Sequence, residues 1–199
     1  MKLLLTSDGL TSNALVDAFK ELAIKPLKKL KVLIVSTGPN TQKILGYIEE
    51  FKKPLITAGV KENRIKTLLL SEPSNTNLSE YDILFVCGGN TFSYLYLIKR
   101  LGMDTKIKEF VKKGIYIGVS AGSILPGPSI TSSSATNNTP LKDYTGLKIV
   151  NFTIIPHMNE EDEKKIKQDV KESKINYDYY IIKDGQGVLV KDKQVRLIK

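Results

Sequence analysis

A serine between two glycines is the first residue in this chain that could do chemistry. Ser120 is the centre of the pentapeptide GVSAG, which runs from Gly118 to Gly122 and directly follows the apolar run 115–117. Where a strand turns sharply into a helix, neighbours without bulky side chains let the chain turn and expose the hydroxyl. The pattern predicts that Ser120 is a nucleophile; the alternative is a small residue at a glycine-rich turn.

The single histidine of the chain could supply the base that such a nucleophile needs. His157 follows the run 153–156, which has the composition of a strand. Serine before histidine is the chain order that α/β hydrolases use. The alternative is a capped or buried polar side chain at a strand end. We interpret Ser120 and His157 as nucleophile and base, an arrangement suited to acyl transfer.

A second glycine-rich turn, Gly88-Gly89-Asn90, follows the apolar run 83–87 and precedes a predicted helix. Backbone N–H groups at such a turn point toward the carboxyl edge of a parallel sheet, where they can bind an anion. With the N–H of Ala121 they would form an oxyanion hole. We expect all four residues to contact the substrate; the alternative is a turn that needs glycine only for its dihedral angles.

The composition is that of a soluble globular protein. The chain has 199 residues, 41% of them hydrophobic, and we expect 1–199 to form a single domain. Asp8 interrupts the first apolar stretch too early for a signal peptide, and no later run reaches membrane length. Cys87 is the only cysteine, which excludes an internal disulfide and a cysteine-based zinc cluster. We therefore expect a cytoplasmic protein with no membrane partner.

The net charge of +9 does not indicate a nucleic-acid site. Only three of the 30 basic residues are arginines, and the lysines are scattered over the predicted surface helices. Nucleic-acid sites favour clustered arginine and exposed aromatic side chains. We expect no nucleic-acid partner, while a positive field is compatible with an anionic small-molecule substrate.

Short apolar runs alternate with amphipathic segments, as in a sheet covered by helices on both faces. We predict strands at 2–6, 31–36, 65–70, 82–87, 114–119, 148–155, 178–182, 187–190 and 194–198. We predict a helix capped by Thr11 or Ser12 that runs to 22, one capped by Thr41 that runs to 51, and one capped by Thr91 that runs to 101. Two further helices are predicted from 104 to 114 and from 160 to 173. The early strands should be parallel. The predicted fold class is α/β, a single-domain, doubly wound and mostly parallel sheet.

Residues 126–146 interrupt this alternation. They have almost no apolar periodicity and include a run of serines and a pair of asparagines. A structureless stretch of this length in a compact domain is usually functional or mobile. It lies between Ser120 and His157.

These motifs together resemble the dipeptidase E group, peptidase family S51. The resemblance rests on Gly118–Ser123, on Gly88–Phe92 and on the pair Pro156-His157. The opening segment 2–7 and the closing segment Asp184-Gly185-Gln186 also fit, so that the resemblance covers nearly the whole chain.

The resemblance implies a flavodoxin-like sheet, related to that of class I glutamine amidotransferases, with serine in place of their cysteine. It also implies peptide hydrolysis, since founding members of the family remove an amino-terminal aspartate from dipeptides. Carried over, it makes Ser120 the nucleophile, His157 the base, and Gly88-Gly89 with Ala121 the oxyanion hole. No metal or organic cofactor is implied.

Two features depart from the family's pattern. The aspartyl dipeptidases orient the histidine with a carboxylate from the loop after the serine, whereas 132–138 contains no acid here. The only carboxylate between Ser120 and His157 is Asp143, so that a triad would need this residue or a different partner. If a triad exists, Asp143 is the expected third member. The dipeptidases also recognise the substrate's aspartate with an arginine beyond the histidine, and this chain has no arginine between Arg100 and Arg196.

The leading hypothesis is a serine hydrolase of the dipeptidase E type that cleaves small peptides, aspartyl peptides among them, through Ser120 and His157. Two alternatives stay open. One is a non-catalytic descendant that binds a small acidic ligand, because the loop acid and the arginine are absent. The other is an esterase, which needs the serine and the histidine but no aspartate pocket. The expected partner is a small peptide or amide substrate, and a homodimer stays open.

Overall fold

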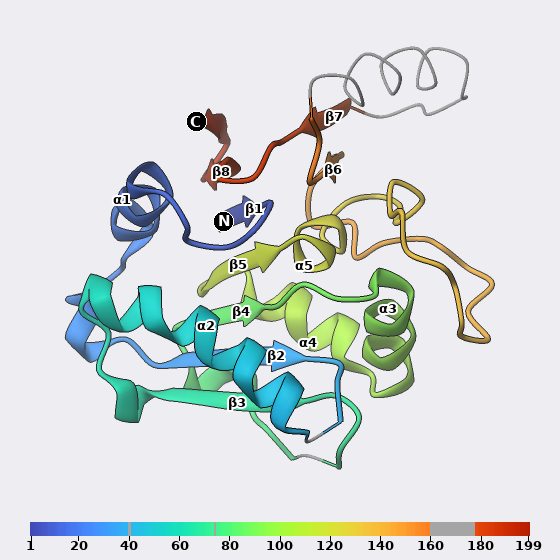
Figure 1. Cartoon of the computed structure of the whole chain (residues 1–199), viewed down its shortest axis with the longest axis horizontal. Coiled ribbons are helices and arrows are strands. Elements are labelled where there is room, and N and C mark those ends of the chain that lie inside the picture. The colour runs from blue at the N-terminus through green and yellow to red at the C-terminus, as the bar shows by residue number, and fades with distance from the viewer. Residues whose placement is uncertain (40, 74, 160–177) are drawn as a thin grey trace.

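The structure, a computed structural model, describes residues 1–39, 41–73, 75–159 and 178–199, and its main feature is a seven-stranded sheet (Figure 1). In spatial order the strands are β3 (Ile65–Leu69), β2 (Val32–Ser36), β4 (Ile83–Val86), β5 (Ile115–Val119), β1 (Lys2–Thr6), β8 (Gly187–Lys191) and β9 (Gln194–Ile198). The first five are parallel, whereas β8 runs antiparallel to both β1 and β9. The predicted α/β class with parallel early strands is confirmed.

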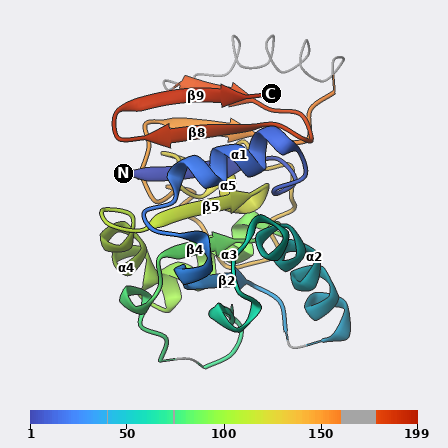
Figure 2. The same ribbon diagram turned by 90° about the vertical axis from the view of Figure 1, so that its left-hand side faces the viewer.

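Helices cover both faces of this sheet. On one face lie α1 (Asn13–Leu22) and α2 (Gln42–Ala58), and on the other α3 (Thr91–Arg100), α4 (Met103–Phe110) and the short α5 (Ala121–Ile124). Figure 2 shows the strands stacked from β9 down to β2, with α1 running in front of them. Single turns of 3-10 helix at Leu27–Lys29, Glu62–Arg64 and Leu78–Glu80 precede β2, β3 and β4.

The strand residues alternate between two cores, one on each face. In β1, Leu3 and Leu5 belong to the core under α3 and α4, whereas Leu4 belongs to the core under α1 and α2. All three side chains are fully buried. Because both faces are covered, these strands are continuous apolar runs, which is why they can be recognised in the sequence.

Two further strands pair with each other and not with the main sheet. They are β6 (Phe152–Ile155) and β7 (Asp178–Ile181), which run parallel. The strand predicted at 148–155 begins only at Phe152, because Lys148 has a left-handed φ of 52° that a strand does not accommodate. Since β6 ends just before Pro156, its direction determines where His157 lies.

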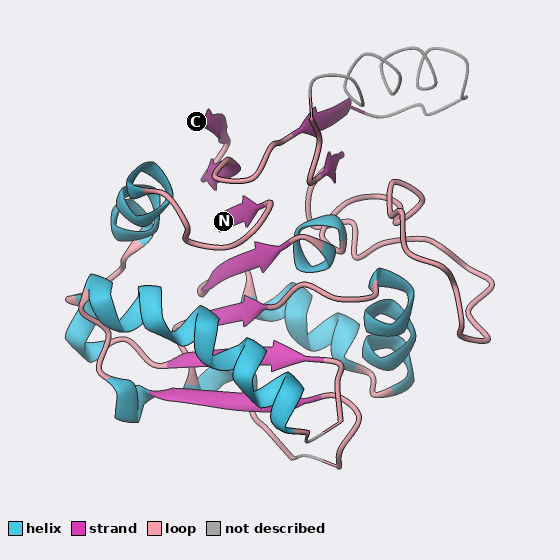
Figure 3. Cartoon of the chain, in the orientation of Figure 1, coloured by secondary structure: helices cyan, strands magenta, loops and turns pink. Residues whose placement is uncertain are grey.

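Residues 126–146 contain no helix and no named strand, as predicted (Figure 3). They are nonetheless held to the rest of the fold. An isolated bridge pairs Ser129 with Thr145, and the Ser132 hydroxyl donates a hydrogen bond to the carbonyl of Ile154 at 3.0 Å. The segment is therefore fixed beside β6.

One helix is longer than predicted. The pattern predicts an end at residue 51, but α2 continues through Pro54 to Ala58. Leu55 is fully buried on this added turn, and Gly59, with a φ of 115°, ends the helix. The burial of one more apolar residue outweighs the helix-breaking tendency of the proline.

The N-cap of another helix differs from the prediction. Asn90, and not Thr91, is the N-cap of α3, because its Oδ1 accepts a hydrogen bond from the N–H of Ser93 at 3.0 Å. Ser12 and Thr41 cap α1 and α2 as predicted. The helix predicted at 160–173 lies outside the described residues.

The contact between α5 and β4 can be tested by stability measurements. A Cβ on Gly122 would lie 2.2 Å from the carbonyl oxygen of Val86, so Gly122→Ala should lower the free energy of unfolding by about 1–3 kcal/mol. Gly46, within α2, has nothing within 4 Å of such a Cβ, so Gly46→Ala should raise it by about 0.5–1 kcal/mol. Urea unfolding of both variants measures this difference. Equal free energies for the two variants would contradict it.

Candidate active site

Ser120 lies at the sharp turn between β5 and α5, as its flanking glycines predict. Its backbone has φ 49° and ψ −109°, a conformation rare for a residue with a side chain. A Cβ on Gly118 would lie 2.4 Å from the carbonyl oxygen of Gly122, so that neither glycine can be replaced without moving the backbone. Two close backbone contacts therefore hold Ser120 in its strained conformation.

Hydrogen bonds from β1 support the same turn. The N–H of Ser120 donates to the carbonyl of Thr6 at 3.0 Å, and the hydroxyl of Ser123 donates to the same oxygen at 2.7 Å. The Thr6 hydroxyl in turn donates to the carbonyl of Gly118 at 2.8 Å. All of these groups are buried except the Ser120 side chain, which is partly exposed. Buried hydrogen bonds therefore hold the backbone that carries the Ser120 hydroxyl.

His157 lies against this serine. Its Nε2 is 2.8 Å from Ser120 Oγ, and its backbone also has a positive φ, of 62°. The N–H of His157 donates to the hydroxyl of Ser7 at 2.9 Å, just beyond the end of β1. The structure thus brings together the two residues that the sequence predicts as nucleophile and base, within the reach that proton transfer requires.

Asp184 contacts the other nitrogen of the imidazole. Its Oδ1 lies 2.8 Å from His157 Nδ1 and accepts a hydrogen bond from the Ser7 hydroxyl at 2.7 Å. Partial burial raises the pKa of Asp184, but the hydrogen bonds from Ser7 and His157 and the charge of the imidazole outweigh it. The pKa of this carboxyl therefore lies below its ordinary value. Serine, histidine and an ionised carboxylate form a continuous relay, the geometry of a hydrolytic triad.

The predicted Gly88-Gly89 turn lies beside the nucleophile. A Cβ on Gly88 would lie 3.5 Å from the Cβ of Ser120 and 2.7 Å from the Tyr47 hydroxyl. The turn follows β4, the neighbour of β5, so both turns meet at the carboxyl edge of the sheet. Ala121, the first residue of α5, is almost fully buried behind Ser120.

Comparison with known proteins identifies the family to which this arrangement belongs. The model described as Peptidase family S51 matches residues 3–198. The chain belongs to peptidase family S51. The resemblance that its motifs carry is therefore confirmed over nearly the whole chain.

Individual relatives agree with this assignment. An uncharacterized peptidase of Listeria monocytogenes serovar 1/2a is 34% identical over 172 residues, which cover 82% of this chain and 83% of the relative. Peptidase E of Nostoc sp. PCC 7120 is 27% identical over 180 residues, 84% of this chain and 72% of the relative.

Solved structures support the fold. A protein from Listeria monocytogenes EGD-e, described as a candidate Peptidase E, has a TM-score of 0.78 at 28% identity and covers 98% of this chain and 96% of its own. A peptidase from an acI-B1 Actinobacterium has a TM-score of 0.70 at 16% identity, covering 99% of this chain and 86% of its own, and shares the fold.

The predicted position of the third triad residue is wrong. Asp143 does not occupy the place beside the imidazole; its carboxylate accepts a hydrogen bond from Lys99 Nζ at 2.7 Å and one from the N–H of Thr145 at 2.9 Å. These hydrogen bonds hold the pKa of Asp143 well below its usual range. Asp184 lies at the position beside the imidazole where a triad carboxylate is expected. The closing motif Asp184-Gly185-Gln186 is the signal in the sequence that points to Asp184. Its proximity to His157, however, depends on how the strands pair.

Asn90 also differs from expectation. Its Oδ1 caps α3, and its Nδ2 donates to the carbonyl of Thr136 at 2.8 Å, so both ends of the amide are used by the fold. Among the described residues, Asn90 is not one of those that line the pocket at Ser120. Its role there is to fix the turn after Gly88-Gly89.

A pocket of about 300 Å³ opens at Ser120 and His157. One wall comes from α2 and the other from the segment after β1. The described lining residues, besides Ser120 and His157, are Ser7, Asp8, Leu10, Thr11, Tyr47, Glu50, Phe51, Pro54, Gly88, Gly89 and Val119. This volume is at the small end of ligand pockets, which suits a substrate of one or two amino acids.

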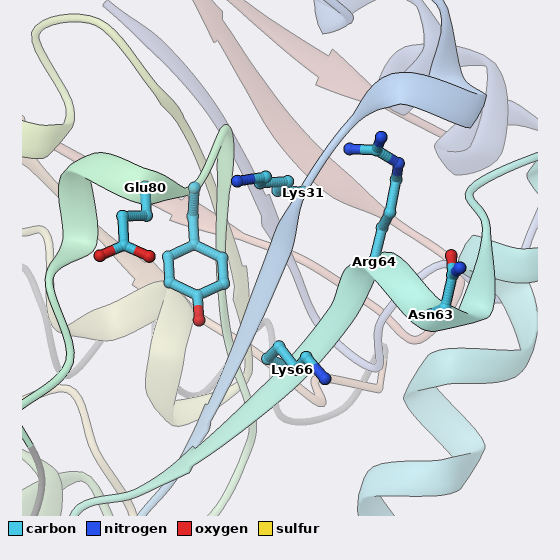
Figure 4. A pocket seen from close by; sticks show the side chains of 6 residues that line it. Lys31, Asn63, Arg64, Lys66 and Glu80 are labelled. Atoms are coloured by element: carbon cyan, nitrogen blue, oxygen red, sulfur yellow. The ribbon is translucent and has the colours of Figure 1, made fainter.

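Another pocket, of about 390 Å³, lies at the opposite, amino edge of the sheet (Figure 4). Its described lining is Lys31, Asn63, Arg64, Lys66, Glu80 and Tyr81. These residues precede or begin β2, β3 and β4, far from the turns where the nucleophile lies, and include no serine or cysteine. Although larger, this pocket offers no group for acyl transfer.

Other chemistries receive no support from the described residues. Cys87 is fully buried, and burial raises the pKa of its thiol to about 12, so that it is not a thiolate at neutral pH. In the described ranges no three His, Cys, Asp or Glu side chains are grouped to hold a metal ion. No helix within them is long and apolar enough to cross a membrane.

The hydrogen bond from Ser7 makes the ionisation of Asp184 testable. Because the hydroxyl donates to the charged form of the carboxyl, Ser7→Ala should raise the pKa of Asp184 toward its ordinary value. A titration of carboxyl carbons by NMR, with Asp184→Asn to assign the resonance, measures the shift. Ser71→Ala, which removes a hydroxyl bonded to the carbonyl of Gly38, is the matched control. An unchanged or lowered pKa in Ser7→Ala would contradict the assignment.

Proposed function

We propose that this member of family S51 is a serine peptidase that cleaves small peptides by acyl transfer, with Ser120, His157 and Asp184 as its triad. The observation that carries the proposal is the relay of two 2.8 Å contacts, from Ser120 Oγ to His157 Nε2 and from His157 Nδ1 to Asp184 Oδ1. The same relay would serve any serine hydrolase; membership in a peptidase family selects the amide bond as the target.

In the first half of the reaction, Ser120 Oγ attacks the carbonyl carbon of the substrate and its proton passes to His157 Nε2. The imidazolium then gives this proton to the leaving amine as the C–N bond breaks, which leaves an acyl-serine. In the second half, water gives its proton to Nε2 and attacks the ester carbonyl. The bond between the acyl carbon and Ser120 Oγ then breaks, the carboxylic acid leaves, and the imidazolium returns its proton to Oγ. Asp184 stabilises the imidazolium in both halves and fixes the tautomer with the proton on Nδ1.

The negative oxygen of the tetrahedral intermediate needs N–H donors that are in place before the reaction. Ala121 is the first residue of α5, where backbone N–H groups have no acceptor within the helix. Gly88 lies opposite, next to Ser120 Cβ. The positions of both residues support the predicted oxyanion hole, in which Gly89 completes the turn.

The non-catalytic alternative rests on the absence of an acid in 132–138 and of an arginine beyond His157. The position of Asp184 beside His157 argues against the first of these grounds. No observation favours an esterase over a peptidase. For aspartyl substrates, the arginine expected beyond His157 is still missing, and the described lining of the pocket contains no lysine or arginine. We therefore propose small peptides as substrates without a requirement for aspartate.

Substitutions in the triad test the proposal, with hydrolysis of a panel of dipeptides beginning with Asp, Glu, Asn, Ala and Lys as the measurement. Asp184→Asn should lower kcat about ten-thousandfold, because the amide favours the wrong tautomer of His157. Ser120→Ala should lower it about a millionfold. The matched control is Asp143→Asn, which makes the same change at a carboxylate bonded to Lys99 and should retain nearly full activity.

Two results would contradict the triad. One is a loss in Asp143→Asn as large as in Asp184→Asn, and the other is hydrolysis by purified Ser120→Ala at the rate of the wild type. Circular dichroism of each variant shows whether a loss reflects chemistry or unfolding.

A further inference from the structure

The pocket beside the nucleophile contains two carboxylates that the triad does not use. Asp8 lies in the segment after β1 and Glu50 lies on α2, so that they come from the two opposite walls. Among the described lining residues these acids have no lysine or arginine beside them. The pocket is therefore locally negative, although the chain as a whole carries a charge of +9.

Asp8 is held in a fixed position next to the triad. Its Oδ1 accepts hydrogen bonds from the N–H of Gly185 at 2.9 Å and from the Thr11 hydroxyl at 2.8 Å. Gly185 directly follows Asp184, so the turn that orients His157 also positions this second carboxylate. Asp8 is only partly buried and remains open to the pocket.

Glu50 lies near the Tyr47 hydroxyl, which points at the Gly88 turn. Burial raises the pKa of Tyr47 to about 12, and electrostatic interactions with Cys87 and Glu50 add to the shift. The hydroxyl is therefore neutral and cannot compensate the carboxylate. Glu50 itself is exposed at the pocket wall, so its charge is available to a ligand.

Apolar side chains line the same pocket as these two acids and Ser120. They include Leu10, Phe51 and Pro54. A long aliphatic side chain that ends in a charge packs its methylene groups on such a surface and keeps the charged end near water. An aspartate side chain would have no such packing and would meet two charges of its own sign.

We propose that the pocket binds its substrate through an ammonium group on the residue that supplies the acyl carbon, with Asp8 and Glu50 as its counter-charges. This rests on the proposed function, because it identifies the acyl side by the position of Ser120. The lining, and not the net charge of the chain, decides the preference, since charges farther away than about 8 Å are screened at physiological ionic strength. The preferred substrate is a peptide that begins with lysine, not with aspartate.

Binding to Ser120→Ala tests the inference without any need for turnover. Isothermal titration compares Lys-Ala, norleucyl-Ala and Asp-Ala, in which the first pair differs only in the ε-ammonium. Lys-Ala should bind about 3- to 10-fold more tightly than norleucyl-Ala, and Asp-Ala more weakly than either. Raising the salt concentration should reduce the difference.

Substitution of the carboxylates assigns the effect to them. In the Ser120→Ala background, Glu50→Gln should bring the ratio of the Lys-Ala and norleucyl-Ala affinities close to one, as should Asp8→Asn. The matched control is Glu49→Gln, which removes the same charge from the neighbouring residue, an ion-pair partner of Lys52 outside the described lining. The control should keep the ratio of the parent.

N-acetyl-Lys-Ala separates the two ammonium groups of the ligand. If it binds as tightly as Lys-Ala, the carboxylates hold the ε-ammonium. A different pattern would place the α-ammonium at the two carboxylates. In that case N-acetyl-Lys-Ala does not bind, while Lys-Ala and norleucyl-Ala bind equally and both lose affinity in Glu50→Gln. The first result supports the proposed preference for lysine, and the second would overturn it.

The proposal is overturned if Asp-Ala binds most tightly, if none of the dipeptides binds, or if Glu50→Gln and Asp8→Asn leave the affinities unchanged. Hydrolysis by the wild type distinguishes this failure from that of the proposed function. Selective binding without any hydrolysis would refute the peptidase but support the ammonium site. Hydrolysis without charge selectivity would support the peptidase and refute the ammonium site.

Discussion

The structure depends on the close approach of the turn at Ser120 to the strands beside it. A side chain at Gly122 would collide with the carbonyl of Val86 in β4, and one at Gly118 would collide with Gly122 itself. This close packing lets Thr6 accept hydrogen bonds from the turn and leaves the Ser120 hydroxyl as the group that faces outward. The strain in the serine backbone is therefore maintained by the surrounding buried sheet, whose stability exceeds the small cost of one unfavourable residue.

The remaining site residues reach the serine because several chain segments pass the same edge of the sheet. Ser7 follows β1, the Gly88 turn follows β4, and His157 follows β6. Asp184 reaches this edge from a strand of the opposite direction. Because β8 runs antiparallel to β1 and Gly187 pairs with Thr6, the residues before β8 lie at the carboxyl edge of the parallel strands. The antiparallel strand thus allows a residue from the last part of the chain to complete the relay.

This difference explains what could be predicted from the sequence. The parallel strands, Ser120 and His157 are recognisable because each depends on a local pattern: an apolar run, a pair of glycines, or a histidine at a strand end. The role of Asp184 depends on the pairing of β8 with β1, which no local pattern shows, and Asp143 was favoured only by its place in the chain. Likewise, the contact of Asn90 with the carbonyl of Thr136 and the burial of Leu55 in α2 beyond Pro54 are tertiary contacts that no local pattern shows.

The central claim is that the fold activates one hydroxyl out of the many that the chain carries. The most direct measurement is reaction of the intact protein with a fluorophosphonate, followed by mass spectrometry of the whole chain and of its peptides. We expect a single adduct in the wild type, located on Ser120, and no adduct in Ser120→Ala under the same conditions. Absence of labelling in the folded wild type, or an adduct on another residue, would contradict it.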